Sequence, residues 1–96
     1  MASLQSLSVP GCVECKKFDD WWSKNSPLFP GVKYEKIVMG EDPRWQELVL
    51  KYQIMSSPGI LVDGELFSSG GVNTAKLTEK LSAIGGSALG GKELGG

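Results

Sequence analysis

The sequence contains no histidine, only two cysteines and no apolar run long enough to span a bilayer. The absence of histidine excludes a Ser-His-Asp triad, a Cys-His nucleophile pair and any histidine metal ligand. A membrane-spanning helix needs about 20 consecutive apolar residues, so we expect no membrane partner. The start of the chain lacks a basic stretch followed by an apolar core, and therefore no signal peptide is predicted.

The sequence also lacks an excess of charge of either sign. Lysine and arginine total 10, aspartate and glutamate total 11, and the net charge is −1. Proteins that bind nucleic acids usually present a strongly basic face, so this balance argues against a nucleic-acid partner. Two cysteines are too few to staple a secreted disulfide scaffold. We therefore expect a cytoplasmic protein, and we expect it to be a monomer.

The composition changes near the C-terminus. Of the 13 glycines, six lie in the last 12 residues, where little apolar surface is available for burial. Such a composition is typical of a flexible tail, although a tail that docks through Leu89 and Leu94 is an alternative. A chain of 96 residues fits one domain. The sequence thus predicts a folded domain over residues 1–84 and a flexible Gly-rich tail over residues 85–96.

Hydrophobic spacing and turn residues divide the domain into seven elements. The expected elements are, in chain order, strand 4–9, helix 12–25, strand 32–39, helix 43–53, strand 60–62, strand 65–67 and helix 74–84. Two strand–helix–strand stretches followed by a hairpin and a helix favour an α/β domain. The sequence therefore predicts a mixed sheet with helices packed on it.

Two cysteines, Cys12 and Cys15, flank two residues where the first strand gives way to the first helix. Unpaired N–H groups and the positive end of the helix dipole favour a thiolate there. Cysteines one helical turn apart can bridge, so Cys12 would attack a partner's disulfide and Cys15 would resolve the mixed disulfide. Lys16 and Lys17 would help to stabilise the thiolate, whereas Glu14 would oppose it.

Other interpretations of the cysteine pair stay open. Free cysteines are often small buried hydrophobes. The pair could instead be half of an iron–sulfur or other metal site shared between two chains, because four-ligand sites usually need two such pairs. A purely structural disulfide is a weaker interpretation, since a bridge that closes so short a loop removes little entropy. A redox-inactive interaction domain that keeps only the fold is a further alternative.

A second informative position is the Ser57-Pro58 step, directly before the third strand. Taken alone, Pro58 is a turn residue or a proline at a strand start. Together with the cysteine pair, it makes the sequence resemble the thioredoxin/glutaredoxin superfamily, most of all its small, glutaredoxin-sized redox proteins. The resemblance covers about residues 3–84. The features that carry it are Pro10-Gly11-Cys12-Val13-Glu14-Cys15, Ser57-Pro58, Val62-Asp63-Gly64-Glu65 and Ser69-Gly70-Gly71.

This resemblance implies a thioredoxin-like fold, β-α-β-α-β-β-α, with a four-stranded mixed sheet between flanking helices. It implies that the bond before Pro58 is cis, that Pro58 packs against the cysteines, and that the Ser57 backbone pairs with an extended substrate. It further implies a thiol–disulfide oxidoreductase with Cys12 as nucleophile and Cys15 as resolving residue, without metal or resident cofactor. Disulfide-containing proteins would be its substrates, and a thioredoxin reductase-like enzyme or glutathione would supply electrons.

Three departures from the glutaredoxin pattern concern glutathione. The dipeptide between the cysteines is Val-Glu rather than Pro-Tyr, residues 8–11 hold no lysine for a glutathione carboxylate, and Ser57 replaces the usual Thr or Val. Backbone N–H groups of Gly70 and Gly71, near a helix start, could still hold a carboxylate, or could serve only a turn. A glutathione-dependent glutaredoxin with glutathione as co-substrate therefore remains an alternative.

Two adjacent carboxylates, Asp19 and Asp20, follow the cysteine pair on the predicted helix. They are either a solvated helix face, or one of them takes a proton from Cys15 during exchange, as a general base would. The sequence leaves this choice open.

Overall fold

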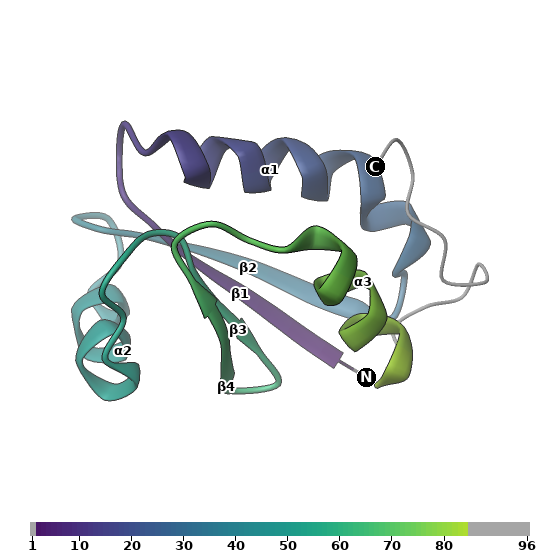
Figure 1. Cartoon of the computed structure of the whole chain (residues 1–96). Coiled ribbons are helices and arrows are strands. Elements are labelled where there is room, and N and C mark those ends of the chain that lie inside the picture. The colour runs from purple at the N-terminus through teal and green to yellow at the C-terminus, as the bar shows by residue number, and fades with distance from the viewer. Residues whose placement is uncertain (1, 85–96) are drawn as a thin grey trace.

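The computed structural model of the chain describes residues 2–84, which form a four-stranded sheet with helices on both faces (Figure 1). The elements are β1 (Ala2–Ser8), α1 (Val13–Asn25), the 3-10 turn η1 (Ser26–Leu28), β2 (Val32–Val38), α2 (Arg44–Tyr52), β3 (Gly59–Val62), β4 (Glu65–Ser69) and α3 (Thr74–Ala83). Apart from the short turn η1, this is the order that the sequence predicts. The predicted tail, residues 85–96, lies outside the described residues.

The strands are arranged in the order β2-β1-β3-β4. β1 and β2 are parallel, whereas the β1–β3 and β3–β4 pairs are antiparallel, so the predicted mixed sheet is confirmed. Ser8, the last residue of β1, lies opposite Val38, the last residue of β2. Because the two strands run in the same direction, the segments that follow them, 9–12 and 39–43, leave the sheet at the same edge. The cysteine pair therefore lies beside the β2–α2 loop.

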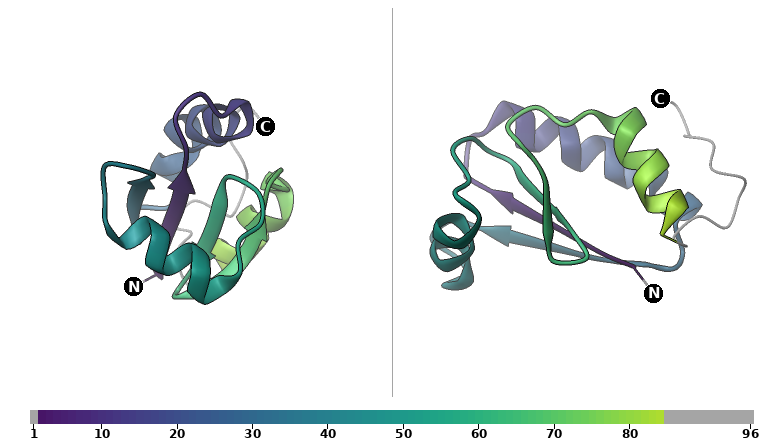
Figure 2. Two further views of the ribbon diagram at one scale, coloured as in Figure 1. Left: turned by 90° about the vertical axis from the view of Figure 1, so that its left-hand side faces the viewer. Right: turned by 60° about the horizontal axis from the view of Figure 1, so that its bottom comes forward.

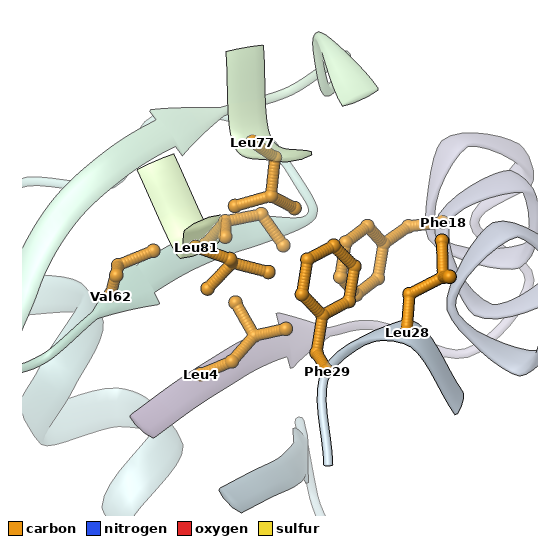
Figure 3. Packing of buried hydrophobic residues seen from close by; sticks show 8 residues of the cluster. Leu4, Phe18, Leu28, Phe29, Val62, Leu77 and Leu81 are labelled. Atoms are coloured by element: carbon orange, nitrogen blue, oxygen red, sulfur yellow. The ribbon is translucent and has the colours of Figure 1, made fainter. Parts of the chain in front are cut away.

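Each face of the sheet carries its own hydrophobic core, because successive strand side chains point to opposite faces. α1 and α3 cover one face and α2 covers the other (Figure 2). Figure 3 shows Phe18 of α1 and Leu77 and Leu81 of α3 gathered around Leu4 of β1 in the larger core. The smaller core, beneath α2, consists of Leu7, Ile37, Ile54 and Leu61.

Helix α2 begins one residue later than the sequence predicts. Pro43 occupies the N-cap and Arg44 is the first helical residue. Asp42 still acts at this end, because its Oδ1 accepts a hydrogen bond from the Arg44 N–H at 2.9 Å. The helix ends at Tyr52, since Gln53 adopts left-handed dihedrals with φ of 53°.

The three helices are short. Within residues 2–84, none is both long and apolar enough to cross a membrane.

Candidate active site

A tight turn delivers the first cysteine to the start of α1. Pro10 and Gly11 are its central residues, Gly11 has φ of +76°, and the Cys12 N–H donates to the Val9 carbonyl at 3.4 Å. Proline followed by a residue with positive φ is the signature of a type II turn. Glycine fits this position because it has no side chain to clash in the left-handed region.

The two cysteines form a disulfide, with their Cα atoms 5.2 Å apart. The interpretation as free buried hydrophobes is therefore wrong. Cys12 is the N-cap of α1, and its Sγ accepts a hydrogen bond from the Cys15 N–H at 3.1 Å. Cys12 is half-buried, whereas Cys15 lies in the first helical turn and is 4% exposed. The pair thus has an outer sulfur, which faces the N-terminal end of a helix dipole, and an inner one.

The charged residues next to the cysteines neutralise one another. Lys16 Nζ lies 3.6 Å from Asp20, and Lys17 Nζ lies 3.3 Å from Glu14. Both are solvent-exposed pairs at helical spacing, which contribute little energy and leave little net charge. The helix terminus is therefore the main group that can favour a thiolate at Cys12.

A cleft of about 470 Å³ opens beside the disulfide. We call it the active-site cleft, and its lining includes Ser8, Cys12, Cys15, Asp19, Lys36 and Glu41. Lys36 of β2 reaches across to α1, where its Nζ lies 2.7 Å from Asp19 Oδ2. Asp19 stands one helical turn after Cys15 and so shares its face of α1.

Of the two candidate carboxylates, the structure places only Asp19 in the active-site cleft. Asp20 is exposed and paired with Lys16. Lys36 and Glu41 were missed by the sequence analysis, because they come from a strand and a loop more than 20 residues away in the chain. Only the strand order brings them to the cysteines.

A buried polar layer lies under this end of α1. Ser6 and Ser8 of β1 are both buried, and their hydroxyl oxygens are 3.3 Å apart. On the neighbouring strand, burial raises the pKa of Tyr34 to about 12, and the charge of Asp19 adds to the effect. Polar groups therefore extend from the active-site cleft into the space between β1, β2 and α1.

The other predicted site residues, Ser57, Pro58, Gly70 and Gly71, lie in the segments directly before β3 and directly after β4. The bond between Ser57 and Pro58 is cis, as the resemblance implies. The Gly70 N–H donates to the Pro58 carbonyl at 3.0 Å. A Cβ atom at Gly71 would lie 3.7 Å from Glu14 Oε1, so this glycine adjoins the cysteine motif.

None of these four residues lines the active-site cleft. Their part in substrate binding stays a prediction. A metal site would need ligands from elsewhere, since residues 2–84 hold no cluster of three or more potential ligands.

A comparison of the sequence with known protein families agrees with the fold and with the cysteine geometry. A sequence profile described as "Thioredoxin domain" matches residues 6–83. The chain belongs to the thioredoxin domain family. No curated protein sequence matches it significantly. A thioredoxin domain with a disulfide-bonded cysteine pair is a thiol–disulfide oxidoreductase, which is the enzyme class that the sequence predicts.

Solved thioredoxin structures share this fold. Thioredoxin f2 of Chlamydomonas reinhardtii superposes with a TM-score of 0.70 at 16% identity, over 91% of this chain and 82% of its own. Thioredoxin of Fasciola hepatica gives 0.67 at 19% identity, over 85% and 79%. Oxidised thioredoxin O2 of Arabidopsis thaliana gives 0.67 at 15% identity, over 88% and 75%. The thioredoxin-like fold is therefore confirmed.

Proposed function

We propose that this thioredoxin-like protein is a protein disulfide reductase in which Cys12 attacks and Cys15 resolves. The observation that carries the proposal is the asymmetry of the pair. Cys12 Sγ is the outer sulfur and accepts the Cys15 N–H at the start of α1, whereas Cys15 is 4% exposed. A substrate disulfide can reach only the outer sulfur without rearrangement of the helix.

The exchange then proceeds in two steps that transfer two electrons. The Cys12 thiolate attacks one sulfur of the substrate disulfide, which forms a mixed disulfide and releases the other substrate sulfur as a thiolate. Cys15 next loses its proton, and its thiolate attacks Cys12 Sγ. The Cys12–Cys15 disulfide forms and the second substrate sulfur leaves.

We assign the proton from Cys15 to Asp19. This carboxylate lines the same cleft as Cys15, and it is one helical turn away along α1. Lys36, at 2.7 Å, positions it. Asp20 points to a different, exposed ion pair and has no role in this step.

An external donor must return the disulfide to the dithiol. We propose a thioredoxin reductase-like enzyme, with glutathione as the alternative. Residues 8–11 offer no cation for a glutathione carboxylate. At the start of α3, the Asn73 side chain already accepts the Lys76 N–H at 3.0 Å, which removes one donor from a would-be anion site. In this proposal the protein is a monomeric electron carrier of the cytoplasm. Its role there is to keep protein thiols reduced.

A coupled assay tests this proposal. The protein reduces the disulfides of insulin while NADPH drives either thioredoxin reductase or glutathione with glutathione reductase. We expect turnover with the first donor system. Cys12→Ser should abolish activity, and Cys15→Ser should accumulate mixed disulfides with the substrate. Turnover by Cys12→Ser, or no turnover with either donor system, would contradict the proposal, and preference for glutathione would identify a glutaredoxin.

A further inference from the structure

A second cleft adjoins the active-site cleft. It has a volume of about 480 Å³ and is formed by the β2–α2 loop and the start of α2. We call it the loop cleft, and its lining includes Met39, Glu41, Asp42, Pro43 and Trp45. Glu41 also lines the active-site cleft. The two clefts therefore share Glu41 as a common wall, and we refer to them together as the groove.

The loop that shapes this groove is held by backbone hydrogen bonds. The Met39 N–H donates to the Ser8 carbonyl at 2.9 Å, which ties the loop to the end of β1. The N–H groups of Glu41 and Asp42 both donate to the Val38 carbonyl at 3.1 Å. A surface that is already ordered costs little conformational entropy when a partner binds.

The cations of the active-site cleft are already compensated. Lys36 lies 2.7 Å from Asp19, and Lys16 lies 3.6 Å from Asp20. Neither lysine therefore contributes much uncompensated positive charge to the groove.

The two carboxylates of the loop cleft, Asp42 and Glu41, differ in whether they form an ion pair. Arg44 forms ion pairs with Asp42 at 2.7 Å and with Glu35 at 2.6 Å, and these hydrogen bonds lower the pKa of both carboxyl groups. Glu41 is exposed and makes no ion pair within the part of the chain that the structure describes. Glu41 is thus the carboxylate of the groove that has no ion-pair partner among residues 2–84, and it lies where the two clefts meet.

Beyond this carboxylate the loop cleft offers apolar surface. Met39 is 42% exposed, and Pro43 and Trp45 complete the wall. An apolar wall beside a carboxylate complements a lysine or arginine side chain, which has an aliphatic stem and a cationic head.

We propose that this groove docks an extended segment of the disulfide-bearing substrate protein, with Glu41 binding a lysine or arginine near the cysteine that Cys12 attacks. The inference rests on the proposed reductase function. A space of about 470 Å³ is roughly 10 Å across, and an extended chain rises about 3.3 Å per residue. The basic residue should therefore lie within about three residues of the attacked cysteine.

Peptides that differ only in charge test this proposal. Each carries one cysteine in a disulfide with a neutral small thiol, and lysine, alanine or glutamate stands three residues away. Second-order rate constants are measured with the pre-reduced protein in a single turnover, so that no electron donor is involved. Each constant is divided by that for dithiothreitol, which removes the intrinsic reactivity of the peptide. We expect the lysine peptide to react about two- to fivefold faster than the alanine peptide.

Charge reversal provides the matched comparison. Glu41→Lys should invert the preference, so that the glutamate peptide becomes the fastest. Glu47→Lys makes the same change of charge at an exposed residue of α2 that lines neither cleft, and it should leave the wild-type preference in place.

Three results would overturn the inference. They are equal rates for the lysine and glutamate peptides, an unchanged preference in Glu41→Lys, and an inversion of equal size in Glu47→Lys. If the wild-type protein reduces the alanine peptide but shows one of these results, only the docking proposal fails. If it reduces none of the peptides, the reductase function fails as well.

Discussion

The ammonium group of Lys36 lies 2.7 Å from the carboxylate of Asp19, so that a strand and a helix are joined beside the disulfide. In the parallel pairing of β1 with β2, Lys36 lies opposite the buried Ser6. This ion pair fixes the only carboxylate of α1 that shares a cleft with Cys15.

Removing the Asp19 charge should slow the second step of exchange. Asp19→Asn leaves a side chain of the same shape that accepts no proton, so we expect the mixed disulfide to resolve on the order of tenfold more slowly near neutral pH. Acid-quench measurements of mixed-disulfide decay follow this step directly.

The pH profile separates proton transfer from a structural effect. The deficit of Asp19→Asn should shrink above about pH 8.5, where a cysteine thiol loses its proton without help. Asp20→Asn is the control, because it removes a neighbouring charge that lies in a different ion pair. A deficit that is the same at every pH, or that Asp20→Asn reproduces, would contradict the assignment.

The ionisation of Tyr34 should lower the free energy of unfolding in alkaline solution. Its pKa is raised from 10.0 to about 12, first by burial and then by the charge of Asp19. Between these two values the unfolded chain has released the phenol proton and the folded chain still holds it. The free energy of unfolding therefore decreases as the pH rises from 10 to 12.

Denaturant unfolding of the wild type and of Tyr34→Phe isolates this contribution, because all other groups titrate in both proteins. The phenylalanine variant should lose less stability over the same alkaline range. Parallel pH dependences in the two proteins would show that Tyr34 has its ordinary pKa.

The larger core should depend on Leu77. This α3 residue is fully buried against Leu4 and Phe18, so Leu77→Ala should cost about 2–5 kcal/mol of unfolding free energy (Figure 3). Leu50, on α2, is 71% exposed, and Leu50→Ala should cost well under 1 kcal/mol. Urea denaturation measures both, and similar losses in the two variants would contradict this account of the core.

Two adjacent glycines should respond differently to alanine. Gly70 has φ of +89°, and a Cβ there would lie 3.2 Å from Ser56 Cβ, so Gly70→Ala should destabilise the fold by about 1–2 kcal/mol. At Gly71 a Cβ meets only Glu14 Oε1, at an ordinary contact distance of 3.7 Å. Thermal unfolding should leave Gly71→Ala near the wild type, and equal losses of stability in the two variants would contradict this account of the turn.

The sequence alone predicted the order of elements and the position of the cysteines, because both depend on local patterns. Pro10-Gly11 marks the turn and the spacing of Cys12 and Cys15 marks the helix start, and both lie where these patterns place them. The start of α2 was predicted one residue early. Pro43 is the N-cap instead of the first helical residue, and Asp42 accepts a hydrogen bond from the Arg44 N–H.

The active-site cleft could not be predicted in the same way. Asp19 and Lys36 are 17 residues apart and meet only because β2 pairs with β1 in parallel, under α1. Glu41 reaches the cleft through the same pairing. The periodicity of a strand shows which face a residue occupies, but it does not show which strand lies next to it.

The cysteine pair and the neighbouring β2–α2 loop follow strands that occupy different places in the sheet. Within residues 2–84, β1 is hydrogen-bonded to a strand on each side, whereas β2 and β4 each pair with one strand only. Cys12 follows the doubly bonded strand, and such strands exchange their amide hydrogens most slowly. The loop that carries Met39 and Glu41 follows an edge strand instead. If this loop docks the substrate as we propose, substitutions in it would change which partners bind while the strand that leads to Cys12 keeps its position.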